Sequence, residues 1–63
     1  MNKIYRVTID ENGETDCVDF TKLDDAMARF RKVARRRSVF SVAVDVYDAT
    51  TREFVKCIAY CED

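Results

Sequence analysis

The three cysteines, Cys17, Cys57 and Cys61, could bind a metal or act as nucleophiles, but the 63-residue chain contains no histidine to assist them. Cys57 and Cys61 are separated by about 13 Å along a strand that rises 3.3 Å per residue, too far for a disulfide or one shared zinc ion. Ser38 and Ser41 have no histidine base either. We therefore expect no metal, no cofactor and no enzymatic activity, with Cys57 as a small core residue and Cys17 exposed.

A block of six basic and no acidic side chains occupies residues 29–37, although the net charge of the chain is only −1. Guanidinium groups in such a block suit phosphates or an acidic protein surface. A second explanation is a solvated helix end, because cations complement the negative end of the helix dipole. The candidate binding residues of this block are Arg29, Lys32, Arg35, Arg36 and Arg37.

Asn12-Gly13 is a strong signal for a two-residue β-hairpin, and it joins segments 3–10 and 14–20. Apolar alternation sets the register and places one face inward. The expected pairs are Tyr5 with Phe20, Val7 with Val18, Ile9 with Asp16, Arg6 with Asp19, and Thr8 with Cys17.

The segment 22–36 has an apolar stripe at helical spacing, and Thr21 precedes it as the expected N-cap. Segments 38–48 and 53–61 then alternate as two further strands, with Phe40 on the inward side beside the valines. An even number of residues in the turn between these two segments favours one regular pairing of the strands, without bulges. It pairs Val46 with Val55, Val44 with Cys57, Val42 with Ala59, Asp45 with Lys56, and Tyr47 with Phe54.

These elements predict an α+β fold of ββαββ type, a single domain over residues 1–63 with four mainly antiparallel strands and one helix on one face. The strand order 2-1-3-4 keeps neighbours antiparallel, and 2-1-4-3 is the competing order. A chain this short buries only about 60% of its unfolded surface. We therefore expect a small core whose stability depends partly on a partner.

One helix leaves the other face of the sheet uncovered, and the alternation predicts apolar side chains there. The candidate partner-binding residues are Tyr47, Phe54, Ile58 and Tyr60. Such a patch suits a protein partner or a second copy of the chain. Cross-strand aromatic pairs that merely stabilise the sheet are an alternative. Base stacking, as on RNA-recognition sheets, is disfavoured by Asp19 and Asp45 on the same face.

The N-terminal residues lack the apolar stretch of a signal peptide, and no apolar run is long enough to span a bilayer. Together with the unpaired thiols, this predicts a cytoplasmic protein without membrane contact. In size and in its order of hairpin, Asp-Phe-Thr helix start, amphipathic helix and valine-rich hairpin, the chain resembles small α+β proteins encoded by phages and mobile elements. Some of these are anti-CRISPR proteins or other inhibitors of host proteins.

The resemblance implies an inhibitor that covers a site on a larger host protein, or host protein complex. The leading functional expectation is accordingly a non-enzymatic protein-interaction domain that acts through the apolar sheet face, with a homodimer as one form of the interaction. The alternative is a nucleic-acid-binding protein that uses the basic block, with an affinity that falls steeply as salt rises.

Overall fold

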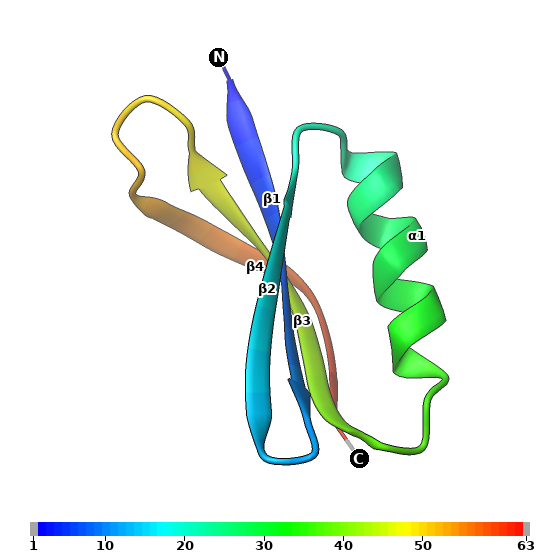
Figure 1. Cartoon of the computed structure of the whole chain (residues 1–63). Coiled ribbons are helices and arrows are strands. Elements are labelled where there is room, and N and C mark those ends of the chain that lie inside the picture. The colour runs from blue at the N-terminus through cyan, green and yellow to red at the C-terminus, as the bar shows by residue number, and fades with distance from the viewer. Residues whose placement is uncertain (1, 63) are drawn as a thin grey trace.

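The computed structural model describes residues 2–62 as one antiparallel sheet with a helix against one of its faces (Figure 1). The elements are β1 (Lys3–Glu11), β2 (Glu14–Phe20), α1 (Leu23–Ala34), β3 (Val39–Asp48) and β4 (Phe54–Glu62). The strand order is β2-β1-β3-β4. The predicted ββαββ fold and its leading strand order are therefore confirmed. No helix within residues 2–62 has the length and apolar character needed to cross a membrane.

The first hairpin follows directly from its turn. Asn12 and Gly13 adopt φ values of 53° and 80°, the left-handed pair that a type I′ turn requires. All five predicted pairs between β1 and β2 are present, from Tyr5 with Phe20 to Ile9 with Asp16. Local turn chemistry and apolar alternation were sufficient to set this register.

Helix α1 is shorter than the predicted segment 22–36. Its N-cap is Lys22, which has extended backbone and provides no side-chain hydrogen bond, so the prediction of Thr21 as the cap is wrong. Asp24 and Asp25 in the first turn complement the positive end of the helix dipole instead. At the other end, the Arg36 N–H donates to the Val33 carbonyl over 3.0 Å in a tighter final turn.

The core lies between α1 and the sheet. The helix contributes Ala26 and Val33 and packs mainly on β3, β1 and β2, while β4 lies at the sheet edge beyond them. The buried sheet residues around these two are Val7, Ile9, Val39, Val42, Val44 and Val46. Valine dominates this core because β-branched side chains pack well on a pleated surface.

The second hairpin departs from the predicted register after its first pair. Tyr47 lies opposite Phe54 as predicted, but the register then shifts twice, and Val55 and Ile58 become extra residues in β4. The other four predicted pairs are therefore wrong. The observed pairs are Val46 with Lys56, Asp45 with Cys57, Val44 with Ala59, and Val42 with Cys61.

The two bulges have a physical consequence for the shape of the sheet. Extra residues in one strand increase its local twist, and the turn between β3 and β4 bends away from α1 (Figure 1). Lys56 lies opposite Val46 and remains exposed. At the turn itself, Arg52 adopts the left-handed conformation with φ of 63°, without a glycine.

Candidate functional site

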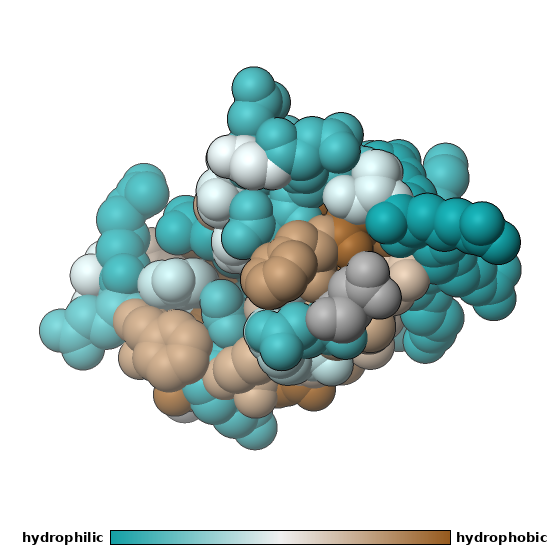
Figure 2. Space-filling view, turned by 90° about the horizontal axis from the view of Figure 1, so that it is seen from below, coloured by the Kyte–Doolittle hydropathy of each residue, from teal (hydrophilic) through white to brown (hydrophobic). Residues whose placement is uncertain are grey.

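A hollow of about 450 Å³ opens at the end of the molecule where α1 stops. It lies between the end of the helix, the start of β3 and the end of β4. Figure 2 looks at this end and shows apolar surface surrounded by hydrophilic side chains. We call it the arginine-rimmed hollow, and its lining residues are Ala34, Arg35, Arg36, Arg37, Val39, Phe40, Val42, Cys61 and Glu62.

Phe40 is the large exposed apolar side chain of the hollow. It is 57% exposed, although the nearby Val39 and Val42 of the same strand are buried. The cause is a register shift between β1 and β3, in which Glu11 pairs with Val39 and Asp10 pairs with Ser41. Phe40 is therefore an extra residue without a partner in β1, and its predicted inward orientation with the valines is wrong.

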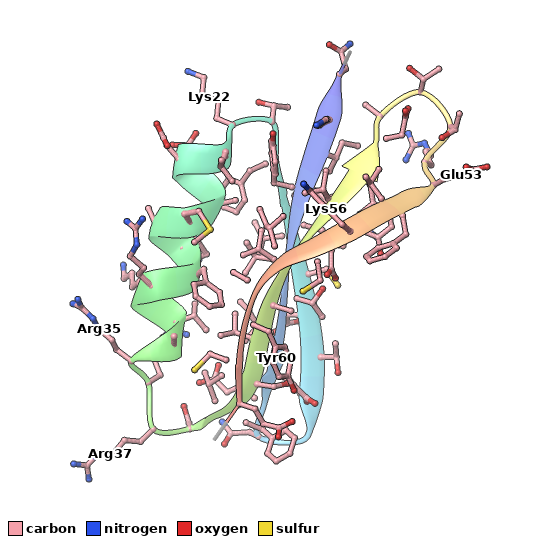
Figure 3. The ribbon with its side chains drawn as sticks, turned by 180° about the vertical axis from the view of Figure 1, so that it is seen from behind. Lys22, Arg35, Arg37, Glu53, Lys56 and Tyr60 are labelled. Atoms are coloured by element: carbon pink, nitrogen blue, oxygen red, sulfur yellow. The ribbon has the colours of Figure 1, made fainter. Side chains whose placement is uncertain are left out.

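Glu11 holds the connection between α1 and β3 on one side of the hollow. Its carboxylate accepts a hydrogen bond from the Ser38 hydroxyl and lies 3.6 Å from the Arg36 guanidinium. In contrast, Arg35 and Arg37 form no ion pair within residues 2–62, and Figure 3 shows both side chains pointing away from the sheet. Two guanidinium groups at the rim thus keep their hydrogen-bonding capacity for a ligand.

The five predicted basic residues divide into two groups. Arg35, Arg36 and Arg37 line the hollow, whereas Arg29 and Lys32 are exposed on α1 and do not line it. The sequence correctly identified the arginines as one cluster near the helix end. It did not indicate the apolar floor beneath them, because that floor comes from β3 and β4.

The helix-free face of the sheet holds a compact cluster around Arg6. Its guanidinium donates two hydrogen bonds to Asp19, at 2.8 and 3.2 Å, and lies 4.6 Å from the centre of the Tyr47 ring. The Tyr47 and Phe54 rings meet edge to face at 5.7 Å. The hydrogen bond from Arg6 lowers the pKa of the Asp19 carboxyl below its ordinary value. Tyr47 is therefore engaged within the chain, whereas Phe54 remains 57% exposed.

Of the other two residues of the predicted apolar patch, Tyr60 lies on the helix-free face as predicted, whereas Ile58 does not. Ile58 packs against the core cluster, so its predicted place on the helix-free face is wrong; the bulge turned it inward. Tyr60 lies opposite Ala43 and is 59% exposed, and its hydroxyl donates to Glu62 over 2.6 Å (Figure 3). This bond raises the pKa of the Tyr60 phenol. Tyr60 is thus separated from Tyr47 and Phe54.

The cysteines are free and exposed in the described chain. Cys57 lies opposite Asp45 rather than in the core, so its prediction as a core residue is wrong. Partial desolvation raises the pKa of the Cys57 thiol, and a hydrogen bond with the Asp45 side chain raises it further. Residues 2–62 contain no group of three or more side chains placed to hold a metal ion.

Comparisons with protein-family models, with curated proteins and with solved structures give no match for this chain. The two surfaces described above differ in what they leave free for a partner. Of these, the arginine-rimmed hollow combines exposed apolar area, an open cavity and cations without internal partners. In the Arg6 cluster, the charged groups of Arg6 and Asp19 are already paired with each other, although Phe54 remains exposed.

Proposed function

We propose that this chain is a non-enzymatic protein-interaction domain whose main binding site is the arginine-rimmed hollow. The observation that carries the proposal is the exposed Phe40 ring beside the buried valines Val39 and Val42, in an open hollow lined by Arg35 and Arg37. A small domain gains stability when a partner covers such a surface. Phe40 at the rim adds an aromatic contact of the kind that dominates binding energy at interfaces.

The charges of the hollow favour an acidic partner segment. Three arginines face one carboxylate, Glu62, among the lining residues, and Glu11 next to the hollow pairs with Arg36. Arginine binds carboxylates through two parallel hydrogen bonds. A volume of about 450 Å³ lies at the small end of the range for ligand sites, roughly 300–1,000 Å³. The partner is accordingly a protein segment with one large apolar side chain and a neighbouring carboxylate.

We extend the proposal to the biological role of the binding site. An inhibitor encoded by a phage or mobile element, which blocks a larger host protein by covering an acidic site, would use a surface of this kind. Tyr47, Phe54 and Tyr60 then serve as secondary contacts on the other side of the sheet. A homodimer is a further form of the proposal, because a second copy also presents acidic segments.

Selection from a random-peptide library against the intact protein tests this proposal. We expect enriched peptides that combine an acidic with a large apolar residue, and their binding should fail with the Arg35→Glu/Arg37→Glu variant. The matched control is Arg29→Glu/Lys32→Glu, which makes two charge reversals on α1 away from the hollow. It should retain binding within about threefold, since remote exposed charges act only weakly.

Two outcomes would overturn the proposal. If the selection enriched no peptide, the hollow would not be a protein-binding site. Equal loss of binding in both variants would show that charge alone matters, without the hollow. If a gel-shift experiment then gave a retarded nucleic-acid band that both variants weaken alike, with affinity falling linearly in log salt, nucleic-acid binding by the basic block would replace it.

A further inference from the structure

We infer that the partner segment binds as an extended strand along the outer edge of β4, over residues 59–62, and inserts one side chain into the arginine-rimmed hollow. This inference rests on the proposed function and specifies how the partner is held. Backbone hydrogen bonds to an exposed sheet edge provide affinity, and pockets beside the edge provide specificity.

The two edges of the sheet differ in their protection. β2 carries three carboxylates in seven residues, Glu14, Asp16 and Asp19, and such charges discourage pairing with an added strand. β4 is protected differently, because Val55 and Ile58 are bulged and interrupt its first part. Beyond these bulges, residues 59–62 contain no bulge, and their one charged side chain is Glu62 at the end. This stretch is the accessible edge of the sheet.

The geometry of residues 59–62 suits an added strand. They pair with β3 without interruption, from Ala59 opposite Val44 to Glu62 opposite Ser41. A regular strand directs its remaining backbone groups outward, where a new strand would lie about 4.8 Å away. Ala59 and Cys61 share the helix-facing side with Val44 and Val42. Their small side chains leave space for a larger neighbour on the added strand.

The hollow lies next to this same edge. Cys61 and Glu62 belong both to the accessible stretch and to the lining of the hollow. A strand beside them directs alternate side chains to the helix side, toward the hollow, where the exposed Phe40 provides apolar contact. The next side chain on that side follows after two residues, about 6.6 Å further along. A carboxylate there would pair with Arg35 or Arg37 when that exposed side chain, which points away from the sheet in Figure 3, turns toward the hollow.

A ligand that binds in this way needs a defined spacing between two of its side chains. The large apolar residue and the acidic residue occupy positions i and i+2 of an extended segment. A capped peptide with the core Thr-Phe-Thr-Asp-Thr has this pattern. Its control, Thr-Thr-Phe-Asp-Thr, has the same composition, but the two side chains point to opposite faces. The first peptide should bind at least about tenfold more tightly, as expected when one charge-assisted contact is lost.

Amide hydrogen exchange measured by NMR on the intact protein tests the strand geometry. In the free protein, the outward amides of residues 59–62 should exchange rapidly, and saturating peptide should slow them by at least about tenfold. Methylation of a peptide backbone nitrogen that faces β4 should weaken binding by about tenfold. As a comparison, the amides of edge strand β2 should keep their exchange rates.

The outcomes separate the two proposals. Binding that requires Arg35 and Arg37 but leaves the residue 59–62 amides unprotected and tolerates N-methylation would overturn strand addition, while the interaction site itself would stand. Equal affinity of the two peptides would also overturn it. If neither of these peptides nor any library peptide bound, the proposed function would fail, and this inference with it.

Discussion

Two valine-to-alanine substitutions distinguish the observed β3–β4 register from a regular one. A regular register places Val55 opposite Val46 on the helix-facing side, whereas the bulge leaves Val55 50% exposed. Val44, opposite Ala59 in the middle of the sheet, is fully buried. Both substitutions remove the same two methyl groups from a strand residue. The difference between their effects therefore reports burial and not strand propensity.

The magnitudes follow from burial. Loss of two buried methyl groups costs about 1.6 kcal/mol, at roughly 0.8 kcal/mol each, and the cavity that remains raises the cost of Val44→Ala to about 2–3 kcal/mol. Val55 is half exposed, so Val55→Ala should cost less than about 1 kcal/mol. A domain of this size has a free energy of unfolding of about 3–9 kcal/mol. Val44→Ala thus removes a large part of it.

Urea and thermal unfolding, followed by circular dichroism, measure both variants. At about 4–8 °C per kcal/mol for a small domain, Val44→Ala should lower the Tm by about 10–20 °C and Val55→Ala by less than about 8 °C. Equal losses in the two variants would refute the bulged register. They would show that Val55 is buried opposite Val46, and the arrangement of β4 beside the hollow would then be wrong.

Three further outcomes follow from the structure. Ile58→Asp should abolish the folded circular dichroism spectrum, because it places a charge against the core, whereas Tyr60→Asp should preserve it; two folded variants would contradict the inward bulge. The lowered pKa of Asp19 means that its stabilisation is present above the unfolded value near 3.9 and is lost as pH falls through the folded value. The free energies of unfolding of wild type and Asp19→Asn, measured by urea titration, should therefore differ at pH 7 by less than about 1 kcal/mol, because the pair is exposed. The difference should disappear in acid. A difference that stays constant with pH would count against the ion pair. Gly13→Ala should lower stability by about 1 kcal/mol, since φ is +80°, and Gly13→Asn by less; an unchanged Tm for the alanine variant would exclude a strained turn.

The parts of the fold that were predictable depend on neighbours close in the sequence. Asn12-Gly13 dictates its own turn, and the alternation on both sides of it sets the β1–β2 register. The helix was visible from its apolar stripe, but its start was not, because the Thr21 side chain makes no cap. Pairing of β3 with β4 followed local pattern only at Tyr47 and Phe54, next to the turn.

The bulges could not be predicted from alternation, because alternation assumes one partner per residue. A strand accommodates an extra residue when this improves packing against elements distant in the sequence. In β4 this turned Ile58 inward and Cys57 outward, and in β3 it left Phe40 exposed. Each of the three side chains therefore occupies a different face or environment from the predicted one.

By itself, the sequence determined the ββαββ order, the first hairpin and the concentration of arginines at the helix end. These properties depend on turn residues, periodicity and charge, which act over a few neighbouring residues. Only the tertiary structure decided what lies beneath those arginines. Because α1 ends at Ala34 while β4 runs beside β3 as far as Glu62, residues remote in sequence meet there around buried valines and the exposed Phe40 ring.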